Sequence, residues 1–496
     1  MKSQNYLYLL VAASAVGKSV LLRKMQEEKL WKSVPKFSTR DVRDDEDDVV
    51  PIDKKSINNS SNRDALQIRY DRIKMLKRMC SGGKGVVYYK NNNFYAITFK
   101  DILSILKENN AVAIVSDFAA LETIKNNKKL KGLVKVLYIA STIDERELLK
   151  RYKSRESTCF DKNAEETQKA IYEISDLCSV LGSAARLNYL DKIEEVMPLL
   201  NEEWNNILPY FETIKTRATN IRMLYNSYIN NIHNIDFPIL NFYDLEYMFN
   251  QVRNIIINKP TKRQIAFPPV FMVCAAPSSG KAQLMEIVGD LGEINGNIKI
   301  TKKYAKRSFR EDTDRRDGMI AIGKTGEFSD YIKEKDKIWE WRFHNLNSEG
   351  THYAVDRSEI EKNIENNTPQ IFISNMEQID NAIKYYPSHV VILYLHATHA
   401  TETRNHIIIK RTHDKLQEIM ENENISLDDA KQQLDNSKKL IKDLEDSIND
   451  DLKEIKHIHY SFLNHNTNID HILLNTGTRE DLVLQMTNLL NYYNNI

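Results

Sequence analysis

The stretch that decides the fold of this 496-residue chain is YLYLLVAASAVGKS at residues 6–19, and VFMVCAAPSSGKA at residues 270–282 repeats its layout. In both, an apolar run that suits a buried strand leads into small residues, then Gly-Lys, then a helical pattern. This is the layout of the P-loop, G-x-x-x-x-G-K-[ST], in which backbone N–H groups at a helix N-terminus surround a phosphate. The sequence therefore predicts two phosphate-binding loops, the alternative being two plain turns of small residues.

The two loops differ in what they offer to a nucleotide. Both have alanine, Ala12 and Ala275, at the position of the first glycine. Alanine is tolerated at such a position when its φ angle is negative. The first loop offers Lys18 to the β- and γ-phosphates and the Ser19 hydroxyl to Mg²⁺, whereas Ala282 replaces that hydroxyl in the second. We expect ATP and Mg²⁺ at the first loop and a damaged donor site at the second. The residues predicted to contact nucleotide are Ala13, Ser14, Ala15, Val16, Gly17, Lys18, Ser19 and Val20 in the first loop and Gly280 and Lys281 in the second.

Length and composition narrow the class of protein. A chain of 496 residues with 42% hydrophobic and 28% charged residues is predicted to fold as two or more soluble globular domains. A net charge of +1 provides no broad basic face, so direct nucleic-acid binding is not expected. No apolar stretch approaches the roughly 20 residues that span a bilayer, so no membrane partner is expected. The four scattered cysteines suit a reducing compartment, and we expect a cytoplasmic protein.

An internal repeat extends beyond the loops. Residues 94–140 and 352–397 both run Tyr-Ala, helix, Asn-Asn turn, apolar strand, helix, apolar strand. Tyr95 follows Lys18 by 77 residues (95 − 18), and Tyr353 follows Lys281 by 72 (353 − 281). Alternating strands and helices predict an α/β fold, with a parallel sheet flanked by helices in each copy.

The repeat and a short polar segment containing Pro260 suggest the domain boundaries. The first domain is predicted over residues 1–258 and the second over 266–496. Each copy has a helical insertion, at about 160–232 and about 412–462. Plain structural helices, coiled packing or a mobile hairpin all fit these segments, and a protein partner could bind through them.

A pair of arginines follows each loop at a similar distance. Arg40 and Arg43 begin 22 residues after Lys18 (40 − 18), and Arg307 and Arg310 begin 26 after Lys281 (307 − 281). An Arg-x-x-Arg pair can bind one phosphate through charge-assisted hydrogen bonds. Two solvated arginines are the alternative.

With these motifs both halves of the chain resemble the guanylate kinase family over most of their length. Family members run G-P-S-G-x-G-K-[ST], T-R-x-P-R-x-G-E, Y-G-T-S, a strand ending I-D, and R-L-x-x-R. The first half matches them in that order at residues 12–19, 39–46, 95–98, 115–117 and 151–155.

The resemblance implies two kinase-like P-loop domains and an ATP-dependent nucleoside monophosphate kinase activity, in which positioning and positive charge carry phosphoryl transfer. Arg40, Arg43 and Tyr95 would bind the acceptor phosphate, and Asp117 would lie beside the acceptor or Mg²⁺. Arg151 and Arg155 would belong to a lid that closes over the transferred phosphoryl group.

The second half departs from the family in other places than the first. Family members read guanine with a glutamate about nine residues before the motif tyrosine. Residues 85–88 contain no carboxylate, whereas Glu340 precedes Tyr353 by 13 residues (353 − 340) and is the candidate reader. Arg411 matches the second lid arginine, and Ile407 replaces the first.

Three functional hypotheses follow. In the first, the first domain is an active phosphotransferase acting on GMP or another phosphate ester, and the second domain mainly binds a ligand or regulates. In the second, both domains are degenerate and the protein is a nucleotide-binding scaffold. A third divides ATP and guanine-nucleotide binding between the domains, with coupled affinities.

Overall fold

The chain forms two compact α/β units in the computed structural model. The first unit is Met1–Ser141 with Asn220–Lys262, and the second is Thr142–Thr219 with Arg263–Ile496. The structure describes residues 4–12, 16–39, 49–52, 65–90, 93–115, 117–142, 222–241, 244–295, 298–306, 318–322, 328, 337–342 and 352–495.

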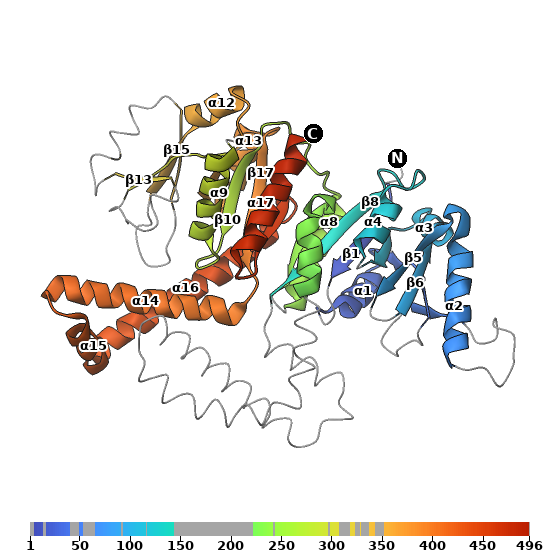
Figure 1. Ribbon diagram of the computed structural model, residues 1–496, viewed down its shortest axis with the longest axis horizontal. Coiled ribbons are helices and arrows are strands. Elements are labelled where there is room, and N and C mark those ends of the chain that lie inside the picture. The colour runs from blue at the N-terminus through green and yellow to red at the C-terminus, as the bar shows by residue number, and fades with distance from the viewer. Residues whose placement is uncertain are drawn as a thin grey trace, which may run out of the picture. The chain divides into compact units, whose positions relative to one another are not determined.

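Each unit is built on a five-stranded sheet whose neighbouring strands are all parallel (Figure 1). In the first unit the order is β2 (Lys32–Ser33), β7 (Ala111–Ile114), β1 (Leu7–Ala12), β8 (Val134–Ser141) and β9 (Phe237–Asn241). In the second it is β11 (Lys299–Ile300), β16 (Gln370–Ser374), β10 (Val270–Ala275), β17 (Val390–Ala397) and β18 (His471–Asn475). The central strands, β1 and β10, are buried along their whole length, as a sheet covered on both faces requires.

A smaller four-stranded sheet accompanies each parallel sheet, and again the two orders match. The first is β4 (Val49–Pro51), β3 (Lys36–Ser38), β6 (Asn93–Thr98) and β5 (Gly85–Lys90). The second is β13 (Met319–Ala321), β12 (Lys303–Ala305), β15 (His352–Asp356) and β14 (Ile338–Arg342).

Helices connect the strands, and several of them begin at a side chain that caps them. In the first unit they are α1 (Lys18–Glu27), α2 (Ala65–Cys80), η2 (Ser81–Gly83), α3 (Phe99–Leu106), α4 (Phe118–Lys125), η3 (Ile232–Asn234) and α8 (Leu245–Asn258). In the second they are α9 (Lys281–Asn295), α12 (Arg357–Glu365), η4 (Met376–Gln378), α13 (Ile379–Tyr385), α14 (Ala400–Glu423), α15 (Leu427–Asn436), α16 (Lys438–His465) and α17 (Arg479–Asn494). Thr98 accepts a hydrogen bond from the Asp101 N–H and Asp244 from the Tyr247 N–H, which satisfies N–H groups that lack a helical partner.

Three helices of the second unit form a hairpin beside its parallel sheet. α14 leads away from β17 and α16 returns toward β18, with α15 at the turn (Figure 1). Leu416, Ile419, Ala430 and Leu434 form a small apolar core within the hairpin. The insertion predicted at 412–462 lies inside these three helices. Of the insertion predicted at 160–232, residues 160–221 lie outside the described residues, and residues 222–230 are helical.

The predicted fold class is confirmed, and the matching strand orders are what the internal repeat predicts. In both units a glutamine side chain forms hydrogen bonds with backbone groups of the last parallel strand, which lies at the edge of the sheet. Gln251 accepts from the Leu240 N–H at 2.9 Å and donates to the Leu240 carbonyl at 2.8 Å. Gln485 does the same for Leu474, at 2.8 Å and 2.9 Å. Within the described residues, no helix combines the length and the apolar character that crossing a membrane requires.

Candidate functional site

The first P-loop joins the central strand β1 to helix α1. Gly17 precedes the helix in the left-handed region, with φ 84°, and Lys18 is the first helical residue. The Lys18 ammonium group donates to the carbonyl of Ala12, the last residue of β1, at 3.3 Å. Ala12 continues the extended strand, so the missing first glycine requires no unusual backbone conformation here.

The glycine and the lysine of the second loop, between β10 and α9, are placed like those of the first. Gly280 has φ 96°, and Lys281 donates to the carbonyls of Ala275 and Ala276 at 3.3 Å and 2.8 Å. Ser278 also lies in the left-handed region, with φ 56°. The structure therefore keeps the loop and its lysine in the second unit although Ala282 offers no hydroxyl.

The other residues predicted for the first loop lie around its helical start. Val16 is buried, Ser19 is the second residue of α1, and the Val20 side chain is half exposed (50%). Ala13, Ser14 and Ala15 lie outside the described residues.

Asp117 follows β7, the neighbour of β1, at the same edge of the sheet as the first loop. Its Oδ1 accepts from the Ala120 N–H at 2.7 Å, so the side chain caps α4. The cap fixes the carboxylate near the carboxyl ends of the parallel strands, where ligands of such sheets bind.

Tyr95 and Tyr353 occupy matching three-layer stacks in the two small sheets. Tyr95 stacks on Tyr88 with ring centroids 5.5 Å apart, and the Lys36 ammonium group lies 5.6 Å from the Tyr95 ring centre. Tyr353 stacks on Trp341 at 6.2 Å, and Lys303 lies 4.9 Å from its ring centre. A cation over an aromatic face is favourable, so each tyrosine is held between a ring and a lysine.

Glu340 and Tyr353 lie on opposite faces of the second small sheet. Trp341 pairs with Tyr353 across β14 and β15, which places both rings on one face. Side chains alternate along a strand, so Glu340 points to the other face, where it is exposed. Trp339 and Trp341 are buried, at 2% and 5% exposure.

The predicted phosphate-binding and lid arginines Arg40, Arg43, Arg151, Arg155, Arg307 and Arg310 lie outside the described residues. The residues that precede Arg40 and Arg307 are described and are anchored alike. The Thr39 N–H donates to the Phe94 carbonyl at 3.1 Å, and the Lys306 N–H donates to the His352 carbonyl at 2.9 Å. Thr39 is also held by Arg72, which donates to its carbonyl at 2.6 Å.

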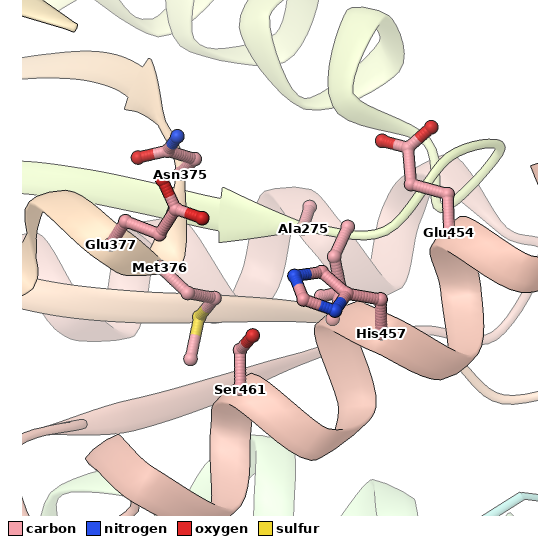
Figure 2. Close-up of a pocket in the computed structure, with 8 residues that line it drawn as sticks. Ala275, Asn375, Met376, Glu377, Glu454, His457 and Ser461 are labelled. Carbon is pink, nitrogen blue, oxygen red and sulfur yellow. The ribbon is translucent and has the colours of Figure 1, made fainter. Parts of the chain in front are cut away.

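Helix α16 lies beside the loop of the second unit. Figure 2 shows a pocket between this helix, the end of β10 and the turn after β16, with Glu454 beside the loop that follows β10. Glu454, His457 and Ser461 line the pocket from one helical face, since they are three and four residues apart. Burial raises the pKa of Glu454, and the nearby charge of Lys281 acts in the opposite direction.

One turn earlier on the same face, Asp451 binds the candidate lid arginine. Arg411 donates to its two carboxylate oxygens at 2.7 Å and 2.5 Å. Asp451 is 6% exposed. In the second unit, carboxylates of one helix therefore lie near two of the cationic groups that the sequence offers to phosphate, Lys281 and Arg411. Sequence reasoning missed Asp451 and Glu454; their three-residue spacing in a helical pattern was the only available signal.

Among the described residues, no group of three or more His, Cys, Asp or Glu is arranged to hold a metal ion. The Ser19 hydroxyl, at the start of α1 next to Lys18, is an oxygen ligand of the kind that Mg²⁺ uses beside a bound nucleotide.

No protein-family model and no curated protein matches this sequence. Among solved structures, a guanylate kinase from Anaplasma phagocytophilum is similar with 17% identity and a TM-score of 0.21, over 35% of this chain and 86% of that one. FtsY from Mycoplasma mycoides is similar with 12% identity and a TM-score of 0.18, over 65% of this chain and 98% of that one. Neither similarity identifies an activity for this chain.

Proposed function

We propose that the first unit is an ATP-dependent phosphotransferase of the nucleoside monophosphate kinase type and that the second unit binds a ligand or regulates. The observation that carries the proposal is the first loop itself. Gly17 and Lys18 open α1 directly at the end of the buried central strand, which is where a helix N-terminus can bind phosphate.

The parts of the first unit fit the steps of phosphoryl transfer. Lys18 would leave the Ala12 carbonyl to bind the β- and γ-phosphates, and Ser19 would hold Mg²⁺, which neutralises charge that develops on the phosphates. Asp117 is fixed by its cap at the carboxyl end of the sheet, and it would lie beside the acceptor or Mg²⁺. The acceptor phosphate would be bound by Tyr95 together with Arg40 and Arg43.

The test is ADP production from ATP and Mg²⁺ with a panel of nucleoside monophosphates and other phosphate esters. We expect Lys18→Ala to lower turnover by 100-fold or more, because one lysine at a transferring phosphate supplies several kcal/mol of stabilisation. Lys281→Ala is the matched control and is expected to leave turnover within about twofold. The absence of ADP with every acceptor would exclude the kinase.

The second unit is proposed as a ligand-binding or regulatory unit because Ala282 provides no hydroxyl and Glu454 lies beside its loop. An exposed Glu340 is retained as a candidate for reading guanine, without Tyr353 on the same face. Calorimetry with GMP on the Glu340→Gln variant tests this assignment. Unchanged GMP affinity would show that Glu340 does not bind the guanine base.

A catalytically degenerate scaffold is the alternative, and the observation that favours it is the second loop, where Ala282 provides no hydroxyl and Glu454 lies near Lys281. It predicts nucleotide binding without turnover in both units. It also predicts that Arg40→Ala abolishes binding of a protein partner. ADP production that depends on Lys18 would argue against it.

A further inference from the structure

An asparagine at the end of the last parallel strand reaches the P-loop in each unit. The Asn241 side-chain amide donates to the Val16 carbonyl at 3.0 Å, across 225 residues of sequence. The Asn475 amide donates to the Ser279 carbonyl at 2.9 Å, across 196 residues. Val16 and Ser279 are equivalent, since each precedes the loop glycine.

The hydrogen bond fixes the orientation of one peptide group. In a trans peptide the carbonyl and the following N–H point in opposite directions. Because Asn241 holds the Val16 carbonyl, the Gly17 N–H must point away from β9. The same holds for the Gly280 N–H, since Asn475 holds the carbonyl before it.

The asparagines are themselves firmly placed. Asn241 is fully buried (0% exposure) and also lies 3.4 Å from the Ser141 hydroxyl, to which it donates. Asn475 packs against Gly280 so closely that a Cβ at Gly280 would lie 2.2 Å from its Nδ2. With φ 96° as well, that position accepts only glycine without strain. The contact is therefore built by both partners, not by a chance approach of two side chains.

We propose that Asn241 and Asn475 are positioning residues of the two loops, each turning the glycine N–H into the loop toward a bound phosphate. For Asn241 the proposal rests on the proposed function of the first unit. The asparagine does not touch phosphate. It acts through the Val16–Gly17 peptide, which without it can rotate and present its carbonyl to the phosphate instead.

The test uses full-length protein labelled with ¹⁵N-glycine, which gives signals from only 15 residues. Gly17 and Gly280 are assigned by substitution, and ATP with Mg²⁺ is titrated. We expect Asn241→Leu to weaken ATP binding by roughly tenfold to a hundredfold, as loss of a hydrogen bond to a charged group does. Gln251→Leu is the matched control. It weakens the same strand edge without touching the loop and is expected to keep ATP affinity within about twofold.

The outcomes separate this proposal from the function. ATP affinity within twofold of wild type in folded Asn241→Leu overturns the positioning role while leaving the kinase proposal intact. If wild type shows no ATP binding, the proposed function fails, and the ligand-free Gly17 signal decides the positioning role. A Gly17 signal that is unchanged by Asn241→Leu would then overturn it.

The second unit supplies a further variant in case Asn241→Leu does not fold. Asn475→Leu is expected to shift the Gly280 signal and to leave the Gly17 signal unchanged. A Gly280 signal identical to wild type would contradict the role of the asparagine in both units.

Discussion

Gln485 shows how one side chain can complete a sheet. It lies in α17, is fully buried, and provides both a donor and an acceptor to Leu474 at the edge of β18. Its third hydrogen bond, to the Asp481 carbonyl at 3.0 Å, keeps it within its own helix turn. Backbone groups at a buried strand edge need such partners, because an unpaired buried N–H or carbonyl is costly.

We expect Gln485→Leu to lower the free energy of unfolding of the second unit by about 2 kcal/mol, since it leaves two buried backbone groups without their partner. Urea unfolding followed by tryptophan fluorescence measures the change. Gln264→Leu, an exposed glutamine of the same unit, is the control and should change the midpoint little. Equal midpoints for the two variants would show that Leu474 finds other partners.

A second residue-scale prediction concerns His396, which is buried in β17. Burial, with a smaller effect of neighbouring His399, lowers the pKa of His396 to about 3 from 6.5. The unfolded chain therefore binds a proton that the folded chain does not bind between these pH values. Stability should consequently fall as the pH drops from about 6.5 to about 3, by up to about 1.4 kcal/mol per pH unit for this one group.

The pH prediction is checked by comparing unfolding midpoints of wild type and His396→Gln across that range. The variant should lose less stability on acidification than wild type does. Parallel curves for the two proteins would mean that His396 does not contribute to the acid sensitivity.

At the scale of elements, α16 connects the helical hairpin of the second unit to its loop. Its acidic face brings Asp451 to Arg411 of α14, and Glu454 to the loop before α9. The helix thereby ties the hairpin to the carboxyl ends of the parallel strands. It also places the Glu454 carboxyl group beside the loop that the sequence predicts to bind phosphate.

We expect Asp451→Ala to destabilise the second unit by about 1–3 kcal/mol, because Arg411 loses two charge-assisted hydrogen bonds in a partly buried setting. Urea unfolding measures the loss. Asp446→Ala, an exposed acidic residue of the same helix, is the control. A cost no larger than that of the control would show the pair to be a weak surface contact.

The sequence was sufficient for the parallel sheets but not for α16's contacts. Every residue of the strands β1 and β10 is buried, and the sequence shows this as two unbroken apolar runs. The sequence also contains Glu454 and Asn241, but it does not show what they contact. Each contacts a loop more than 170 residues away in the chain, and hydrophobic periodicity does not predict contacts between segments so far apart.

The same limit applies to the two motif tyrosines. Tyr95 and Tyr353 were predicted from their motif, but the lysines above them and the rings below them come from neighbouring strands. Strand register also separates Glu340 from Tyr353, because a shift of one residue changes the face. Spacing along the chain cannot reveal that.

At the scale of the whole molecule, the two units share one topology but differ in the side chains around their loops. Both keep the loop, its lysine, the asparagine and the glutamine. The first has a serine, Ser19, where the second has Ala282, and among the described residues the second has the carboxylates of α16 beside its loop. The shared parts build the loop and the sheet around it, and the differing parts are the group that would hold Mg²⁺ and the carboxylates beside the loop.

This division predicts one ATP bound per chain, not two. Isothermal titration with ATP and Mg²⁺ should give a stoichiometry near one, and Lys18→Ala should remove it while Lys281→Ala preserves it. Two equivalent sites, or binding that depends on Lys281, would contradict the assignment of the donor site to the first unit.

The reach of Asn241 has a consequence for synthesis on the ribosome. Gly17 emerges early, but the side chain that orients the peptide before it lies on β9, the last strand of the unit. The loop therefore stays incomplete until residue 241 has been made and β9 has joined the sheet beside β8. A nascent chain that stops earlier contains the Gly-Lys sequence without the hydrogen bond that orients its peptide group. Under the proposed function, nucleotide binding would thus report that the whole first unit, and not its opening segment alone, has folded.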